Sequence, residues 1–186
     1  MKNEKFISLL PLETERLIIN PTSKNDIDLI LKMDKQEETQ KFLGGIKNKT
    51  YEERISFLEK KEIKLLNNLA SSLTIYLKQS NIPIGFVELK IDDDNNNAEI
   101  SFIFDIDYTK KGYCYEASKK LMDISFNTLK LNKIYADTIE GNEGSQKVLA
   151  KLGFVHEGTR RKHVFNKSDG KFYDLIDYGI LQENYK

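Results

Sequence analysis

The sequence contains very little cysteine, because Cys114 is the only one among its 186 residues. A single cysteine excludes an intrachain disulfide framework and a cysteine metal cluster, and it suits a protein of a reducing compartment. The chain also lacks an excess of either charge, since lysine plus arginine and aspartate plus glutamate each number 29. Without a net positive field the chain has no general means of binding a nucleic acid backbone, so we expect no nucleic-acid partner.

Long apolar runs are absent as well. Residues 6–12 come nearest to a signal peptide, but this segment is short, contains Pro11 and runs directly into charged residues without a small-residue cleavage site. No run approaches the roughly 20 apolar residues that a membrane-spanning helix needs. We therefore expect a cytoplasmic protein with no membrane partner.

The first part of the chain predicts one strand followed by two helices. The strand covers residues 16–21 and ends at a proline, and the helices cover 25–36 and 50–66. Ser23 with Asp26 is typical of a helix N-cap, and Thr50 with Glu53 forms a capping box. The apolar spacing of the second helix predicts a buried stripe of Tyr51, Ile55, Leu58 and Leu65.

Three β-rich runs follow. Residues 73–77 and 84–91 are separated by turn-forming residues and predict a hairpin. The polar run 92–97 predicts a solvated loop. In residues 98–106 apolar side chains alternate with Glu99, Ser101 and Asp105, which predicts a long strand with these polar residues on one face.

A strand, a turn, a helix and a second strand then succeed one another. The helix is predicted from Gly112 to about Leu131, and the second strand from Lys133 to Ile139. Such a βαβ unit places its two strands parallel, with a right-handed crossover.

The end of the chain predicts a short helix and a hairpin. Asn142 caps the helix and Gly153 ends it, and residues 154–165 and 171–181 form the hairpin. The whole pattern is that of an α/β (α+β) protein with a mixed sheet and helices on both faces. The length suits one core, so we expect residues 1–186 to form a single domain.

Two helix starts offer polar sites at one edge of this sheet. Lys110, Lys111 and Gly112 precede the helix of the βαβ unit, and Asn142 opens the helix after the next parallel strand. The free N–H groups and the dipole of a helix start attract anions, and open α/β sheets bind ligands at the carboxyl ends of their strands. A plain solvated turn and a plain helix cap remain the alternative interpretations.

The residues at these two places resemble one family. The stretch Thr109-Lys-Lys-Gly-Tyr-Cys-Tyr-Glu-Ala117 is similar to the acetyl-CoA pyrophosphate loop of GNAT acyltransferases. The stretches 142–145 and 151–154, Glu157-Gly158, Arg160 or Arg161, and Asp174 resemble the series found in the RimJ/RimL-type branch, which includes acetyltransferases of ribosomal-protein N-termini. The opening 12–17 also resembles that branch, so the resemblance covers nearly the whole chain.

The resemblance implies a fold and a function. The GNAT fold has a mixed central sheet of six to seven strands, in which the parallel strands 4 and 5 splay apart. It implies an acetyl-CoA-dependent N-acetyltransferase in which a primary amine, such as a protein or peptide N-terminus, attacks the thioester directly. Acetyl-CoA is then the cosubstrate, and no metal is expected.

The resemblance also implies roles for individual residues. The pantetheine arm would lie along strand 98–106, with backbone N–H groups near the thioester oxygen. Ser145 would stabilise the departing thiolate, because the tyrosine that many GNAT enzymes use is replaced by Leu149. The expected cosubstrate-binding residues are Phe102, Ile103, Phe104, Thr109, Lys110, Lys111, Gly112, Tyr113, Cys114, Asn142 and Ser145.

A general base is also needed, because a primary amine near pKa 10 must lose a proton before it attacks. Glu99 is the candidate, since it lies on strand 98–106 and faces away from Phe102 and Phe104. A solvent-facing strand glutamate, and a first-turn helix residue in the case of Ser145, are the alternative interpretations.

Three residues depart from the family pattern. Thr109 replaces a Gln or Arg, Lys110 replaces a glycine that is frequent in this branch, and Cys114 replaces a Gly or Ala. A lysine charge can compensate for the lost donor, whereas a positive φ at Lys110 would cost of order 1 kcal/mol or more. These departures motivate a second hypothesis, a CoA-binding or effector-binding module without catalysis.

Other features of the sequence leave the acceptor and the assembly open. His156 and His163 lie seven apart on a predicted strand, hence on opposite faces, so they do not form a metal site. Peptide N-termini, polyamines, aminoglycoside antibiotics and amino acids all remain candidate acceptors. A homodimer and a plain interaction protein are further open alternatives.

Overall fold

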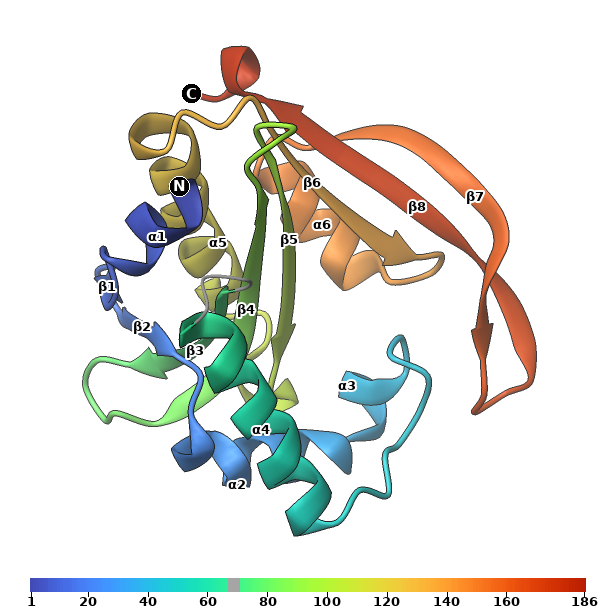
Figure 1. Cartoon of the computed structure of the whole chain (residues 1–186). Coiled ribbons are helices and arrows are strands. Elements are labelled where there is room, and N and C mark those ends of the chain that lie inside the picture. Colours follow the sequence, from blue (N-terminus) through green and yellow to red (C-terminus); the bar gives the residue numbers. More distant parts are fainter. Residues whose placement is uncertain (67–70) are drawn as a thin grey trace.

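The computed structural model describes residues 1–66 and 71–186, and within this part the strands form one mixed sheet in the order β1-β2-β3-β4-β5-β6-β8-β7 (Figure 1). Among the described strands only β5 and β6 pair in parallel, and all other neighbours pair in antiparallel fashion. The strands are β1 (Leu12–Glu13), β2 (Leu17–Pro21), β3 (Ser71–Leu77), β4 (Pro83–Asp92), β5 (Asn97–Phe104), β6 (Lys133–Ile139), β7 (Val155–Asn166) and β8 (Lys171–Leu181). The two-residue β1 brings the sheet to eight strands, where the sequence predicted six to seven.

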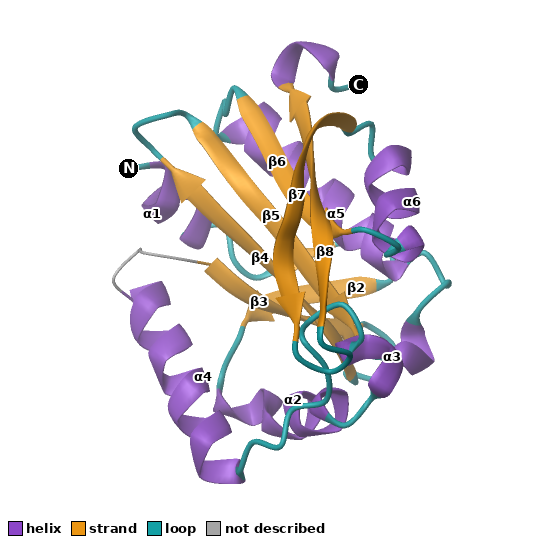
Figure 2. Cartoon of the chain, turned by 90° about the vertical axis from the view of Figure 1, so that its right-hand side faces the viewer, coloured by secondary structure: helices purple, strands orange, loops and turns teal. Residues whose placement is uncertain are grey.

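The helices lie in two groups, with α2, α3 and α4 together at one end of the molecule and α1, α5 and α6 away from them (Figures 1 and 2). Their bounds are α1 (Lys2–Ile7), α2 (Ile27–Asp34), α3 (Glu37–Gln40), α4 (Tyr51–Leu66), α5 (Tyr113–Asp123) and α6 (Glu143–Lys151). A π-helical turn, Ile124–Thr128, extends α5. No helix in the described part of the chain is long and apolar enough to cross a membrane.

Two apolar clusters hold these layers together. The larger one packs α5, through Ala117 and Leu121, against the buried faces of the strands. The smaller one joins Ile27 and Ile30 of α2 to Leu58 of α4. The opposite placement of the two clusters confirms the predicted mixed sheet with helices on both faces.

The predicted caps form as expected. Ser23 Oγ accepts a hydrogen bond from Asn25 N at 3.2 Å, and the Asp26 carboxylate accepts one from Ser23 N at 2.8 Å. Thr50 and Glu53 make the reciprocal pair of the capping box before α4. Each cap satisfies N–H groups that the first helical turn would otherwise leave unpaired.

The predicted buried stripe of α4 is only partly right. Leu58 is fully buried, but Tyr51 is 52% exposed. Tyr51 is the first residue of the helix, beyond the area that α2 covers. Its helical spacing from Leu58 therefore does not bring it into the core.

The end of β5 also differs from the prediction. The strand stops at Phe104, and a 3-10 turn, Ile106–Tyr108, follows. Ile106 is 38% exposed while Asp105 is 1% exposed, which is the reverse of the predicted alternation. The alternation fails because Asp105 leaves the strand and is covered by Lys32 of α2 and by Gln36 between α2 and α3, which supply polar partners for its carboxylate.

Candidate active site

The parallel strands β5 and β6 separate after a short paired segment. They pair at Asn97↔Lys133, Ala98↔Ile134 and Glu99↔Tyr135, and β6 then turns away from β5 (Figure 1). β8 pairs with the whole of β6 through Ile139, so β6 follows β8 from this point. The splayed parallel strands expected from the resemblance are therefore present.

The separation leaves a seam in which main-chain groups of β5 have no partner on β6. Asp105 N donates to Ile84 O on β4 at 3.0 Å. Alternate residues of a strand point their main-chain groups to opposite neighbours, so the N–H groups of Phe102 and Phe104 point toward the β6 side. Ile103 lies between them, with its main chain toward β4. This seam is the segment in which the sequence placed Phe102, Ile103 and Phe104.

The turn before α5 has the backbone of an anion-binding loop. Lys110 has φ +59° and Gly112 has φ +83°. Two left-handed residues turn the chain sharply enough to aim the first N–H groups of α5 outward, at the end where the helix dipole is positive. The positive φ considered for Lys110 is therefore real, and it puts strain on a non-glycine residue.

Contacts within the turn set the positions of its other residues. Thr109 Oγ1 donates to Ile106 O at 2.9 Å, and Lys111 Nζ donates to Asp107 O at 2.7 Å. Lys110 and Lys111 are exposed. Both ammonium groups thus lie at the surface of the turn.

Arg16, which precedes β2 and was not predicted as a site residue, contacts this turn. Arg16 Nη1 donates to Lys111 O at 3.1 Å, and its Nε donates to the Glu116 carboxylate at 2.6 Å. Its guanidinium lies 4.6 Å from the ring centre of Tyr113. These two hydrogen bonds and the stacking contact of one guanidinium thereby fix the backbone of the turn relative to the start of α5.

Cys114 lies in the first turn of α5 and is largely enclosed. Burial raises the pKa of its thiol to about 12. A thiol with such a pKa is almost wholly protonated at neutral pH, so Cys114 is a packing residue in the chain as it stands.

The second helix start carries Asn142 and Ser145. Asn142 Oδ1 accepts a hydrogen bond from Ser145 N at 3.2 Å, so Asn142 is a helix cap, as one alternative held. Within the described part of the chain the Ser145 hydroxyl has no hydrogen-bond partner. Because α6 follows β6 directly, this hydroxyl lies at the same edge of the sheet as the turn before α5.

Glu99 lies at the last paired position of β5 and β6. Its carboxylate is 3.7 Å from Lys90 Nζ on β4, in a partly exposed ion pair. Along β5, Ser101 and Ile103 share its face, and both line a cavity between the sheet and the helices α2 and α4. Glu99 thus lies on the predicted face of β5, two residues before Ser101 of the cavity wall.

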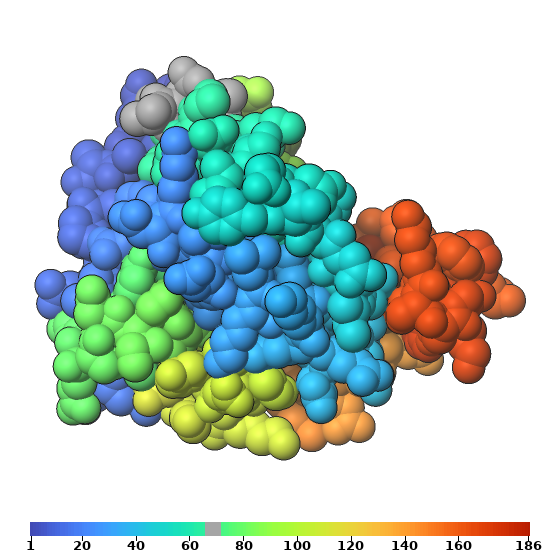
Figure 3. Space-filling view, turned by 90° about the horizontal axis from the view of Figure 1, so that it is seen from below, coloured from blue at the N-terminus to red at the C-terminus, as the bar shows by residue number. Residues whose placement is uncertain are grey.

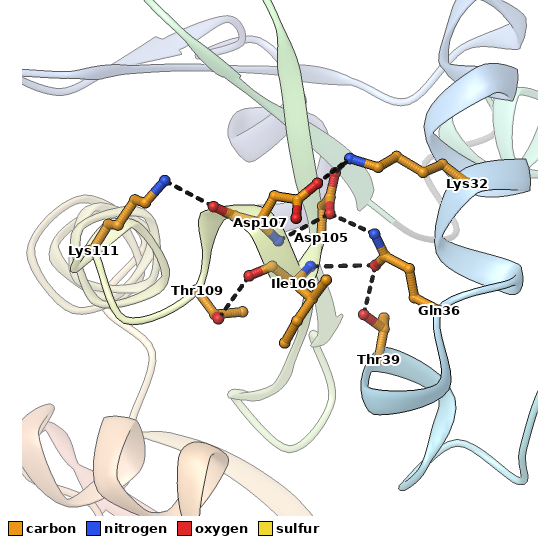
Figure 4. Close-up of polar contacts among 8 residues, drawn as sticks. All are labelled: Lys32, Gln36, Thr39, Asp105, Ile106, Asp107, Thr109 and Lys111. Atoms are coloured by element: carbon orange, nitrogen blue, oxygen red, sulfur yellow. Dashed lines mark hydrogen bonds and ion pairs between the residues drawn. The ribbon is translucent and has the colours of Figure 1, made fainter.

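A polar network joins α2 to the end of β5 (Figure 4). The Asp105 carboxylate accepts hydrogen bonds from Lys32 Nζ at 2.5 Å and Gln36 Nε2 at 2.6 Å, and Gln36 Oε1 accepts one from Ile106 N at 3.2 Å. Burial alone would raise the pKa of Asp105, but these hydrogen bonds outweigh it and keep the pKa below its ordinary value. The network fixes α2 against the segment that leads into the turn before α5.

A cavity of about 260 Å³ lies between the α2–α4 group and the sheet. Its walls come from the helices α2, α3 and α4, the segment between α3 and α4, the strands β3 to β5, and Thr22 after β2. Seen from below, residues 20–60 cover the middle of this face, and the tip of the β7–β8 hairpin stands to one side (Figure 3). The hairpin tip reaches the segment after α3, where Asn166 Nδ2 donates to Lys41 O at 3.2 Å.

The cavity wall contains five charged residues that the sequence did not single out. They are Asp34, Lys47, Arg54, Lys61 and Glu88. They come from two helices, one loop and one strand, and no local motif connects them. The fold brings these residues together, and nothing in the sequence indicates that they form one set.

Comparisons with known proteins agree with this architecture. A family model described as an acetyltransferase (GNAT) domain matches residues 16–155. The N-acetyltransferase YjdG of Bacillus subtilis (strain 168), itself uncharacterized, is 32% identical over 161 residues, which cover 82% of this chain and 95% of that protein.

Solved structures share the fold while their names differ in the acceptor. Spermidine N-acetyltransferase from Vibrio cholerae, in complex with CoA and spermine, aligns with a TM-score of 0.79 at 22% identity over 92% of this chain and 99% of that one. Ribosomal-protein-S5-alanine acetyltransferase from Vibrio fischeri aligns with a TM-score of 0.75 at 23% identity, over 94% and 98% of the two chains.

Proposed function

Because this chain belongs to the acetyltransferase (GNAT) domain family and is an N-acetyltransferase, we propose that it transfers acetyl from acetyl-CoA to a primary amine by direct attack. The observation that carries the proposal is the separation of β5 from β6 after Glu99, between the starts of α5 and α6. We infer that this arrangement forms the slot for acetyl-CoA, with main-chain donors on one side and two helix N-termini at its end.

The residues around the slot suit the parts of acetyl-CoA. The left-handed turn Thr109–Cys114 with Lys110 and Lys111 would hold the pyrophosphate, because helix N–H groups and ammonium groups both favour phosphate oxygens. The N–H groups of Phe102 and Phe104 would bind the pantetheine arm and the thioester oxygen. The Asn142 Nδ2 group, which the cap leaves free, is available to the same arm.

Acetyl-CoA, when bound, supplies an acetyl group activated as a thioester. The amine nitrogen forms the C–N bond as the C–S bond breaks, the sulfur keeps the electron pair, and the nitrogen gives up one proton. Preorganised N–H donors stabilise the negative charge that develops on the carbonyl oxygen. The N–H groups of Phe102 and Phe104 would perform this task in a seam that β6 leaves open.

The reaction needs one side chain that accepts the amine proton and another that donates a hydrogen bond to the departing sulfur. We assign Glu99 as the base that receives the amine proton through water, since it stands on the cavity face of β5 beside Ser101. We assign the Ser145 hydroxyl as the donor that stabilises the departing thiolate, since its Oγ is unpaired within the described residues. Its backbone N–H is held by Asn142, which fixes the position of the residue.

A second function has two specific observations in its favour. The left-handed conformation of Lys110 costs free energy, and the Thr109 hydroxyl is already paired with Ile106 O. Both facts weaken the turn as a phosphate site relative to one with glycine and a long donor. The alternative is a CoA-binding module that has lost catalysis.

The acceptor is the finer part of the proposal. A protein or peptide N-terminal amine and a small-molecule amine, such as a polyamine, an antibiotic or an amino acid, fit the chemistry equally. The neighbours named above include one that carries spermine and one named for a ribosomal protein. The charged residues of the cavity wall bear on the choice between these classes.

Release of CoA thiol tests the proposed function directly. The full chain is mixed with acetyl-CoA and a panel of peptide N-termini and small amines, and binding of acetyl-CoA is measured separately by calorimetry. We expect thiol release with at least one amine. Binding without release from any amine would favour the module without catalysis, and absence of binding at high micromolar acetyl-CoA would refute both.

Replacement of Ser145 tests the assigned proton donor. We expect Ser145→Ala to lower kcat by about tenfold or more, with little change in the affinity for acetyl-CoA. Ser80→Ala, at an exposed serine in the turn between β3 and β4, is the matched control. An unchanged kcat in Ser145→Ala on a good acceptor would remove the catalytic role of this hydroxyl.

A further inference from the structure

The charges on the cavity wall do not balance. Two of the five charged residues are acidic, Asp34 and Glu88, and three are basic, Lys47, Arg54 and Lys61. The wall therefore carries one more positive charge than negative. A cavity of one net sign concentrates ligands of the opposite sign.

Four of these charges are already paired with each other. Arg54 donates through two nitrogens to the carboxylate of Asp34, with Nε to Oδ2 at 2.6 Å. Lys61 Nζ donates to both carboxylate oxygens of Glu88 at 2.9 Å. Within each pair the two charges neutralise one another, so neither carboxylate is free to bind a cationic ligand.

Among the described residues, Lys47 is the charged residue of the cavity wall that belongs to neither pair. Its backbone N donates to Asp34 O at 3.1 Å, which fixes the residue beside the last turn of α2. Its ammonium group is half-buried and has no hydrogen-bond or ion-pair partner in the described part of the chain. Burial and the neighbouring Arg54 lower the pKa of Lys47, against a smaller raising effect of Asp34. An ammonium in such a place lacks the anion that would stabilise it.

From the paired charges and the unpaired Lys47, we propose that the cavity binds the acceptor and that this acceptor is a small primary amine that also carries a carboxylate. The inference rests on the proposed function and names its substrate class. The carboxylate would pair with Lys47. Ser101, Phe102 and Ile103 form part of the same wall, so the amine of the same molecule can face the seam between β5 and β6.

The same charges argue against a polyamine. A polyamine carries several positive charges and would meet a wall with a net positive charge and no free carboxylate. The acidic side chains of Glu13, Glu37 and Glu38 do not supply a free carboxylate here, since Glu13 pairs with Lys78 at 2.9 Å and neither Glu37 nor Glu38 lines the cavity. Like charges at close range repel, so such an acceptor is disfavoured in this cavity.

The volume agrees with a molecule of amino-acid size. At about 260 Å³ the cavity is near the lower end of small-molecule sites, which span about 300–1,000 Å³. It has room for one amine, one carboxylate and a side chain. The apolar walls of Met33, Phe57 and Phe86 would cover that side chain.

Matched acceptors test the inference in the parent chain. Thiol release is measured with leucine, phenylalanine and β-alanine against leucinamide, phenylalaninamide and β-alaninamide, and also with spermidine and a short peptide with a free N-terminus. Rates are compared as kcat/KM per neutral amine, because the amides lose their proton more easily. We expect each acid to exceed its amide by at least about tenfold, since a hydrogen bond to a charged group is worth that much or more.

Replacement of Lys47 locates the effect. Lys47→Met should bring the acids and amides to within about twofold of each other, and Lys47→Arg should keep most of the preference. Lys49→Met is the matched control, because Lys49 lies in the same loop, is exposed and pairs with Glu53 at 2.7 Å. It should leave the preference of the parent unchanged.

Each outcome decides between the hypotheses. Preference for the amides, for spermidine or for the peptide in the parent chain overturns the inference while leaving the acetyltransferase function in place. A preference for the acids that persists in Lys47→Met also overturns it. Failure with every amine refutes the proposed function itself and is therefore distinct. The acid and amide comparison needs no variant, so it stays decisive if Lys47→Met does not fold.

Discussion

Lys32→Met removes the cation that holds α2 to the end of β5. Lys32 Nζ contacts the Asp105 carboxylate at 2.5 Å and the Asp107 carboxylate at 2.6 Å (Figure 4). Asp105 is 1% exposed, whereas Asp107 is well exposed. Methionine keeps the length and most of the apolar contact of the side chain, so the change isolates the charge and its hydrogen bonds.

The expected loss of stability follows from the burial of the two carboxylates. The exposed contact to Asp107 contributes little, because water and salt screen it. The contact to buried Asp105 is a charge-assisted hydrogen bond, worth about 1.5–3 kcal/mol. Gln36 and the Asp107 backbone N–H still satisfy part of that carboxylate. We therefore expect the free energy of unfolding to fall by about 2 kcal/mol, which is a decrease of about 4–8 °C in Tm for a chain of this size.

The pH dependence of this loss has a definite sign. The pKa of Asp105 is lowered in the folded chain, so its contribution is present above the unfolded value near 3.9 and disappears as the pH falls through the folded value. The pKa of Lys32 is raised, so its contribution is complete below about 10.4 and disappears as the pH rises through the folded value. The difference between parent and variant should be level from about pH 5 to pH 9 and shrink on both sides.

Urea unfolding followed by circular dichroism measures this difference at each pH. Lys24→Met is the control, because Lys24 forms an exposed ion pair with Glu59 at 3.0 Å, and it should leave the unfolding midpoint unchanged. If Lys32→Met is as stable as Lys24→Met at pH 7, the network does not stabilise the fold. If its loss grows steadily toward low pH, the assignment to the ionised Asp105 is wrong.

Three further changes test other parts of the site. Gly112→Ala forces a side chain onto a residue with φ +83° and places its Cβ 3.3 Å from Arg16 Nη2. The KM for acetyl-CoA should therefore rise about tenfold, and an unchanged KM would show that the turn does not contact the cosubstrate. Glu99→Gln should lower kcat at pH 7 by about a hundredfold or more if Glu99 is the base, whereas a loss confined to Glu88→Gln would move that role to the cavity glutamate. The thiol of Cys114, with its pKa raised to about 12, should be ionised in roughly one molecule in ten thousand at pH 8, so a disulfide reagent should react slowly with the native chain and rapidly after denaturation; rapid reaction of the native chain would contradict the burial.

Elements defined by local signals could be predicted from the sequence. The strand Lys133–Ile139 has its predicted bounds, because a dense β-rich run stands between a polar turn and a helix cap. The caps at Ser23, Thr50 and Asn142 also form as expected. Each depends on residues within three positions along the chain, so one sequence window contains the whole interaction.

Elements that depend on distant partners could not be predicted in this way. Helix α1 buries Phe6 completely, yet its six residues are too few for a periodic pattern. Asp105 was assigned to a polar strand face because nothing near it in sequence indicates a cover. Its partner Lys32 lies 73 residues earlier, and only the packing of α2 brings the two together.

The same distinction separates the two halves of the candidate site. The proposed cosubstrate half consists of helix starts that directly follow parallel strands, so one stretch of sequence defines each part, and its residues could be proposed from the sequence. The acceptor half takes Asp34 from one helix, Arg54 and Lys61 from another, Glu88 from a strand and Lys47 from a loop. Pairing within that set leaves Lys47 without an anion, and this excess appears only when the partners are known. An acceptor specificity that depends on an unpaired charge would therefore be a property of the folded chain. Substitutions that exchange the pairs should change the acceptor while the fold and the cosubstrate slot stay the same.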